Sequence, residues 1–177
     1  MESERTITIF GSSRAKGDSE AYAEAYQLGK LLAESGFTVC NGGYGGIMEA
    51  SARGAKEAGG KTVGVTTAVF KNSSPNSWID INTQTESSIQ RLMAMTSSGD
   101  AFVMLRGGIG TLAEMTFVWA SATARELRKP IILVGNSWQR IIDALSEHLS
   151  ITCRDTEVLI MVDSAKEAAE ELLKTFE

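Results

Sequence analysis

The stretch AFVMLRGGIGTLAEM (residues 101–115) joins a short apolar run to a glycine-rich turn and then to a helix-forming segment. A continuous apolar run of this length is typical of a strand that is covered on both faces of a parallel sheet. The glycines at 107–110 can then form a tight turn into a helix, whose first backbone N–H groups lack partners. This pattern predicts one strand–turn–helix unit of an α/β fold.

The same alternation of strand and helix patterns recurs along the chain. Apolar or β-rich runs predict strands at 6–10, 37–40, 61–65, 79–81, 101–105, 130–134 and 158–162. Helical periodicity predicts helices near 18–35, 46–58, 87–98, 110–127, 137–149 and 164–176. Because such alternation builds right-handed βαβ units, we predict a single domain over residues 1–177. It should contain a doubly wound, mostly parallel sheet with helices on both faces.

The composition excludes several classes of protein. Of the 177 residues, 43% are hydrophobic and 22% are charged, which suits one globular domain with a full core. The net charge of −5 argues against a broad surface for a nucleic-acid backbone. The first residues are polar, and no apolar run approaches the roughly 20 residues of a membrane span. We therefore expect a cytoplasmic protein with neither nucleic-acid nor membrane partners.

The cysteines and the single histidine give no sign of a metal site. Cys40 and Cys153 lie far apart and match neither a zinc nor a redox spacing. His148 has no Asp, Glu or Cys arranged around it on its predicted helix. These absences also argue against a histidine-based catalytic triad. We expect no metal and no cofactor.

Three loops of unusual composition follow the first, second and fifth predicted strands, at 11–14, 41–46 and 107–111. Ligands of open α/β sheets bind at the carboxyl ends of the strands. Glycines at a helix N-terminus let backbone N–H groups approach an anion. Together the loops predict a site for a phosphate-bearing ligand. The candidate contacts are Gly11, Ser12, Ser13, Gly42, Gly43, Gly45, Arg106, Gly107, Gly108, Gly110 and Thr111.

The motifs that are missing narrow the ligand further. The first loop is not G-x-G-x-x-G, and the second strand ends at Cys40-Asn41 without an acidic residue to hold an adenosine ribose, which disfavours a dinucleotide. The chain contains neither a P-loop motif nor a G-x-S-x-G elbow. A nucleoside monophosphate, or a similarly compact ligand, remains as the predicted partner.

These motifs resemble those of the LOG ("lonely guy") family of cytokinin riboside 5'-monophosphate phosphoribohydrolases, often labelled possible lysine decarboxylases. GGIGTLAE (107–114) is similar to the family signature PGGxGTxxE. FGSS (10–13), NGGYGGIMEASARGAKEAGG (41–60) and SIQRLMAM (88–95) extend the similarity through most of the chain. The resemblance implies a Rossmann-like fold, a homodimer, and cleavage of the N-glycosidic bond of a nucleoside 5'-monophosphate. It also implies that Arg91 and Glu114 are the catalytic pair.

The chain departs from the family pattern at a few positions. Arg106 stands where the signature has proline, Leu92 follows Arg91 where lysine is usual, and Thr66-Thr67 follows Gly-Val where a proline is common. These departures leave the catalytic pair intact but bear on the choice of substrate. Relatives with the same fold include molybdenum-cofactor carriers, so a non-catalytic nucleotide- or cofactor-binding protein is the alternative. The decarboxylase label fails, because no lysine has the context of a pyridoxal-phosphate site.

Several candidate residues also have a purely structural interpretation. Thr111-x-x-Glu114 is a capping-box pattern, in which Glu114 would only satisfy N–H groups at a helix start. Arg106 is equally a phosphate ligand or a partner in a strand-end salt bridge, and Ser12 and Ser13 could donate to phosphate or cap a turn. Aromatic residues are candidates to stack on a base or to fill the core: Tyr44, Trp78 and Trp119.

One helix lacks a polar face. Around Met115–Ala120, within the predicted helix 112–127, the residues are apolar on nearly every side, whereas a helix that covers a sheet usually carries a polar stripe. Either the helix is buried within one chain or its outer face meets a second copy. We expect a homodimer that uses this helix.

Overall fold

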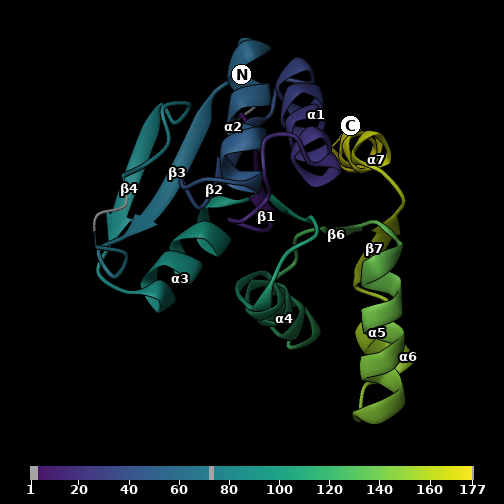
Figure 1. Ribbon diagram of the computed structural model, residues 1–177. Coiled ribbons are helices and arrows are strands. Elements are labelled where there is room, and N and C mark those ends of the chain that lie inside the picture. The colour runs from purple at the N-terminus through teal and green to yellow at the C-terminus, as the bar shows by residue number, and fades with distance from the viewer. Residues whose placement is uncertain (1–3, 72–73, 177) are drawn as a thin grey trace.

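The computed structural model describes residues 4–71 and 74–176, whose strands form one seven-stranded sheet (Figure 1). The strand order is β4-β3-β2-β1-β5-β6-β7, and every neighbouring pair is parallel. The strands are β1 (Thr6–Phe10), β2 (Thr38–Asn41), β3 (Thr62–Thr67), β4 (Ile81–Thr85), β5 (Ala101–Met104), β6 (Ile131–Val134) and β7 (Leu159–Val162). The predicted doubly wound α/β sheet is confirmed, with all strands parallel rather than most.

Helices cover both faces of the sheet (Figure 1). One face carries α1 (Glu20–Glu34), α2 (Ile47–Glu57) and α7 (Ala165–Phe176). The other carries α3 (Ser88–Ser98), α4 (Ile109–Thr123) and α5 (Asn136–His148). The short α6 (Cys153–Thr156) lies between α5 and β7 in the chain. Among the described residues, no helix has both the length and the apolar character needed to cross a bilayer.

Alternating side chains of the central strands fill two separate cores. In β1, Ile7 and Ile9 point into the core under α1, α2 and α7, whereas Phe10 points into the core under α3, α4 and α5. In β5, Val103 belongs to the first core and Phe102 to the second. This period of two follows from the pleat of a strand, and the continuous apolar runs exist because both faces are buried.

The order of the strands reverses between β1 and β5. From β1 the chain winds outward through β2, β3 and β4, and from β5 it winds in the opposite direction through β6 and β7. The loops after β1 and β5 therefore diverge to opposite faces and leave a crevice between them. A reversal of this kind is where open α/β sheets bind their ligands.

The structure corrects some boundaries. The strand predicted at 79–81 is β4, at Ile81–Thr85; this edge strand is polar and mostly exposed, so hydropathy could not locate it. Helix α6 was not predicted, because its four residues are too short for periodicity. Helix α4 ends at Thr123 rather than near 127. The chain turns there through Arg125, whose φ of 61° ends the helix in the left-handed conformation.

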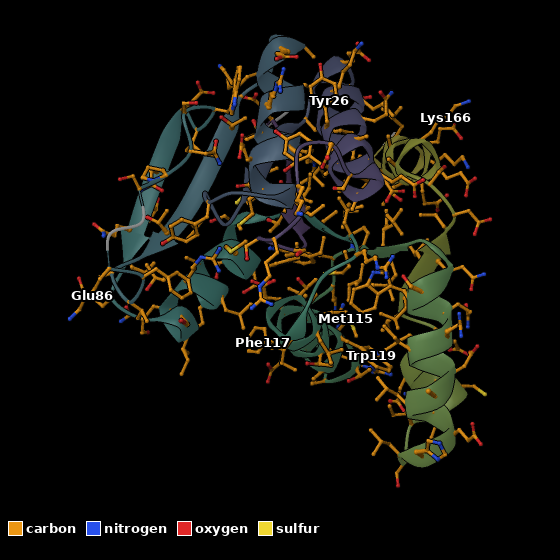
Figure 2. The ribbon with its side chains drawn as sticks, viewed as in Figure 1. Tyr26, Glu86, Met115, Phe117, Trp119 and Lys166 are labelled. Atoms are coloured by element: carbon orange, nitrogen blue, oxygen red, sulfur yellow. The ribbon has the colours of Figure 1, made fainter. Side chains whose placement is uncertain are left out.

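Helix α4 is buried on one side only. Met115, Val118 and Trp119 lie in the core, and the indole N–H of Trp119 donates to the carbonyl of Asp155 at 2.7 Å. Phe117 lies on another side of the helix and is 41% exposed (Figure 2). Trp119 therefore fills the core, and the outer face of α4 is apolar but uncovered.

Candidate active site

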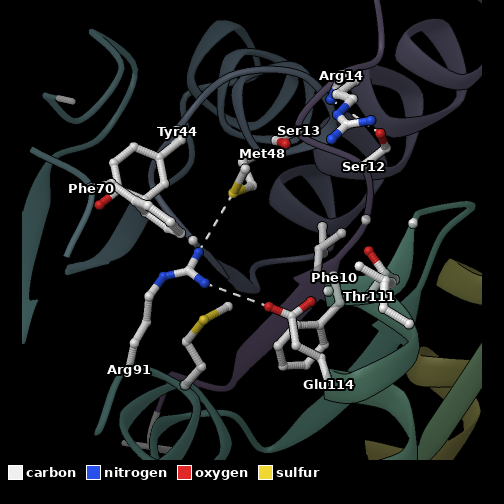
Figure 3. A pocket seen from close by; sticks show the side chains of 17 residues that line it. Phe10, Ser12, Ser13, Arg14, Tyr44, Met48, Phe70, Arg91, Thr111 and Glu114 are labelled. Carbon is white, nitrogen blue, oxygen red and sulfur yellow. Dashed lines mark hydrogen bonds and ion pairs between the residues drawn. The ribbon is translucent and has the colours of Figure 1, made fainter. Parts of the chain in front are cut away.

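A cavity of about 290 Å³ opens at the carboxyl ends of β1, β2 and β5, where the strand order reverses (Figure 3). It draws residues from both faces of the sheet and from segments far apart in the chain. Its lining is Ile9, Phe10, Gly11, Ser12, Ser13, Arg14, Gly42, Tyr44, Met48, Phe70, Arg91, Met95, Gly108, Ile109, Gly110, Thr111 and Glu114. Most of the residues predicted from the sequence meet here, including both members of the expected catalytic pair.

The loops around the cavity are tied together through Ser12. The backbone N–H of Ser12 donates to the carbonyl of Arg106 at 3.2 Å, which joins the loop after β1 to the loop after β5. The carbonyl of Ser12 accepts from the N–H of Ile47 at 2.9 Å, which joins the same loop to the start of α2. These bonds join the loop after β1 to its two neighbours at the rim of the cavity.

The N-terminus of α4 faces the cavity. The helix begins at Ile109 after its N-cap Gly108, and no side chain caps it. Nothing lies within 4 Å of the position that a Cβ would take at Gly108 or Gly110. The N–H groups of the first turn have no intrahelical acceptor, and the helix dipole adds positive potential there. This end of the cavity is therefore suited to an anion such as phosphate.

Arg91 reaches the cavity from α3 and is held on several sides. Its Nε donates to the carbonyl of Val65 at 2.6 Å, and its guanidinium lies 5.6 Å from the centre of the Tyr44 ring. A Cβ at Gly42 would overlap the Nη2 atom of Arg91, so glycine is required at this position for the guanidinium to fit. Arg91 is thus fixed by a backbone carbonyl, an aromatic face and the absence of one side chain.

Glu114 faces Arg91 across the cavity. The Nη1 of Arg91 lies 3.5 Å from Oε1 of Glu114, and the two side chains are 13% and 19% exposed (Figure 3). Burial raises the pKa of Glu114 to about 7, although Arg91 opposes this by favouring the carboxylate. The structural alternative of a capping box does not hold, because Thr111 lies inside the helix, whose N-cap is Gly108, and the carboxylate of Glu114 turns to Arg91. A carboxyl group whose pKa lies near neutral pH is suited to accept a proton.

Tyr44 and Phe70 form an aromatic wall opposite the anion-binding end (Figure 3). Their rings meet edge to face with centroids 5.6 Å apart. The Tyr44 hydroxyl donates to the carbonyl of Thr67 at 3.2 Å and accepts from the N–H of Thr67 at 2.9 Å. Both bonds fix the ring, which therefore offers a rigid apolar surface for a flat ligand group.

A family model matches residues 4–169 of this chain, and it describes the SLOG cluster4 family. The chain belongs to this family. An uncharacterized protein of Archaeoglobus fulgidus is 36% identical over 73% of the chain and 83% of its own length. A cytokinin riboside 5'-monophosphate phosphoribohydrolase of Mycobacterium tuberculosis is 30% identical over 81% of each protein. These matches confirm the predicted resemblance to the LOG family.

Solved structures confirm the fold of this SLOG cluster4 member. The molybdenum cofactor binding protein of Rippkaea orientalis superimposes with a TM-score of 0.82 at 22% identity, over the whole of both chains. The molybdenum cofactor carrier protein of Chlamydomonas reinhardtii gives a TM-score of 0.75 at 22% identity, over 97% of each chain. At such low identity the likeness concerns the Rossmann-like architecture alone.

The SLOG cluster4 chain uses its loop glycines in different ways. The cavity lining includes Gly11, Gly42, Gly108 and Gly110, whereas four predicted contacts lie outside it: Gly43, Gly45, Arg106 and Gly107. The N–H of Gly43 already donates to the side-chain oxygen of Asn41 at 2.8 Å. A Cβ at Gly107 would overlap the Thr111 hydroxyl, so this glycine serves close packing.

Other lining residues of the SLOG cluster4 site were not singled out from the sequence. Phe70 belongs to no motif and follows β3 in the connection to β4, and Met48 belongs to the glycine-rich stretch 41–60 but has no predicted role of its own. Trp78, a candidate for base stacking, instead lies beside Arg53, away from the cavity. Where the structure describes the chain, no group of three or more His, Cys, Asp or Glu residues is placed to hold a metal ion.

Proposed function

We propose that this protein hydrolyses the N-glycosidic bond of a nucleoside 5'-monophosphate to release the free base and ribose 5-phosphate. The observation that carries the proposal is the largely buried Arg91–Glu114 pair, which lies beside an uncapped helix N-terminus in one cavity. The names of relatives, including the phosphoribohydrolase of M. tuberculosis, support the same reaction class.

The dimensions of α4 suit such a substrate. Gly110 lies in the first turn and Glu114 lies about one turn further on, which corresponds to roughly 5.4 Å along the axis. A 5'-phosphate bound at the first turn therefore brings the anomeric carbon of its ribose near the carboxylate. The base then extends toward Tyr44 and Phe70, whose rings provide a stacking surface.

The reaction breaks the bond between the anomeric carbon and the base nitrogen, and the electron pair leaves with the base. Positive charge develops on the sugar, and the carboxylate of Glu114 stabilises it. A water oxygen bonds to the anomeric carbon and gives its proton to Glu114, while solvent protonates the departing base. Arg91 orients the carboxylate and keeps part of it ionised at neutral pH. No residue in this scheme requires a metal ion.

A panel of nucleoside monophosphates tests the proposal. Free base and ribose 5-phosphate should appear from 5'-monophosphates, cytokinin riboside 5'-monophosphates first among them, and not from the matching nucleosides. The phosphate is required because its binding energy at α4 positions the sugar. Equal rates on adenosine and adenosine 5'-monophosphate would contradict the proposal. Tight binding without base release would instead favour the carrier alternative.

We also propose that two copies of the chain pair through the outer faces of α3 and α4. Ile89 and Met93 on α3 are 73% and 55% exposed, and Ile109 and Phe117 on α4 are 83% and 41% exposed. Phe117→Glu should then yield monomers in light scattering, whereas Leu149→Glu, on exposed apolar surface beyond α5, should not. Trp119→Glu is no test, because Trp119 is buried within one chain. A monomeric wild type would refute the pairing.

A further inference from the structure

Two arginines follow the strands that border the cavity, and the structure separates their roles. Arg106 is exposed and does not line the cavity; its carbonyl is occupied by the N–H of Ser12. Arg14 lies on the opposite loop and lines the cavity beside Ser12 and Ser13 (Figure 3). The arginine that lines the cavity is therefore Arg14 and not Arg106, which stands next to the glycine signature.

The loop that carries Arg14 is held close to its neighbours. Ser12 bonds to the loops on either side, and its Oγ accepts the N–H of Arg14 at 3.0 Å. A Cβ at Gly46 would overlap the backbone of Ser12 and Ser13, so the start of α2 packs directly against this loop. Arg14 thus projects from backbone whose position relative to the start of α4 is fixed.

The charge of Arg14 is also uncompensated. Of the ion pairs formed within 4–71 and 74–176, none involves Arg14, whereas Arg91 is paired with Glu114. The N-terminus of α4 contributes further positive potential to the same cavity. Among the described residues, Arg14 and the start of α4 thus present positive charge to this space without a carboxylate partner, which favours a doubly charged phosphate monoester.

We infer that Arg14 is the residue that makes the site selective for the 5'-phosphate, and that Arg106 takes no part in it. This assignment rests on the proposed function for the identity of the substrate. The backbone N–H groups at the start of α4 bind one side of the phosphate, and the Arg14 guanidinium binds the other through its planar fork of donors. Arg91 then contacts the sugar and the base rather than the phosphate.

Calorimetric titration with ribose 5-phosphate tests the assignment without requiring turnover. Arg14→Ala should weaken binding about 10- to 50-fold, the usual loss for a charge-assisted hydrogen bond. Arg14→Lys should recover part of that loss, and the matched control Arg106→Ala should bind within about twofold of wild type. Because the phosphate has a second pKa near 6, the penalty of Arg14→Ala should shrink below that pH. Thermal unfolding of Arg14→Ala should match wild type, since the side chain is exposed.

Kinetics separate this inference from the proposed function. Arg14→Ala should lower kcat/KM for the 5'-monophosphate by the same factor as its affinity for ribose 5-phosphate, whereas the matched control Arg106→Ala should keep the wild-type kcat/KM. A wild type that binds ribose 5-phosphate through Arg14 but releases no base would overturn the proposed function alone. Arg14→Ala with unchanged binding, an equal loss in Arg106→Ala, or no binding by wild type would overturn the assignment to Arg14.

Discussion

Helices α2 and α4 both begin after a glycine-rich loop, and both have a glycine N-cap without a side-chain cap. At α2 the N–H of Ile47 is taken by the carbonyl of Ser12, and Gly46 has a φ of 67°. At α4 the first turn opens to the cavity, and Gly108 has ordinary extended backbone. Similar composition therefore serves close packing at the start of α2 and leaves the start of α4 open to the cavity.

Replacing glycine by alanine should have opposite effects on stability at the starts of α2 and α4. Gly46→Ala places a Cβ against the backbone of Ser12 and Ser13 at a left-handed residue, so the free energy of unfolding should fall by about 2–4 kcal/mol. Gly110→Ala should keep or raise stability by up to about 1 kcal/mol, because alanine favours helix, while weakening the binding of ribose 5-phosphate. Urea unfolding and calorimetry measure the two effects. Equal loss of stability in both variants would contradict the division of roles.

Within the loop before α2, alanine substitutions at Gly42 and Gly45 should differ in their effect on turnover. Gly42→Ala displaces the Arg91 guanidinium, so turnover should fall about 10²-fold, comparable to the loss of one preorganised charged group. Stability should change little, because the displaced atoms are the flexible ends of Arg91 and Met48. Gly45→Ala meets only ordinary contacts and serves as the control. Steady-state kinetics measure the effect. Unchanged activity in Gly42→Ala would show that turnover does not require a fixed position of the Arg91 guanidinium.

The carboxyl group on α4 should make stability depend on pH. Glu114 holds its proton more tightly in the folded chain, with a pKa of about 7, than at its ordinary value of 4.5. Its contribution to the free energy of unfolding is therefore fully present below about pH 4.5 and is lost as the pH rises through 7. Between pH 5 and 8, wild type should lose about 1–3 kcal/mol more stability than Glu114→Gln. Denaturant unfolding at pH 5 and pH 8 measures this difference. Equal losses of stability in wild type and Glu114→Gln would show that folding does not raise the pKa of Glu114.

The same pKa predicts the pH profile of turnover. If the ionised carboxylate accepts the proton of water, kcat/KM should rise with pH and level off above about 7. A profile that is already flat from pH 5 would show that another group is the base.

The sequence predicted the architecture well because buried parallel strands are continuous apolar runs, as in β5 and β6. It misplaced β4, whose exposed edge position removes that signal. Arg91 and Glu114 were assigned through the family resemblance, since their meeting across the cavity depends on how α3 and α4 pack. No sequence pattern separated Arg14 from Arg106, or Gly42 from Gly43, because those roles are set by tertiary neighbours rather than by residue type.

The proposed reaction requires that Glu114 performs chemistry rather than holding the start of α4. Base release by Glu114→Gln, measured beside its affinity for ribose 5-phosphate, tests this most directly. Glu114→Gln should release base about 10²–10³-fold more slowly than wild type, and its affinity for ribose 5-phosphate should stay within about threefold, because the backbone at 107–111 is unchanged. Glu49→Gln, on the first turn of α2 and hydrogen-bonded to Tyr22, should be as active as wild type. Turnover by Glu114→Gln at the wild-type rate would show that Glu114 has no catalytic role.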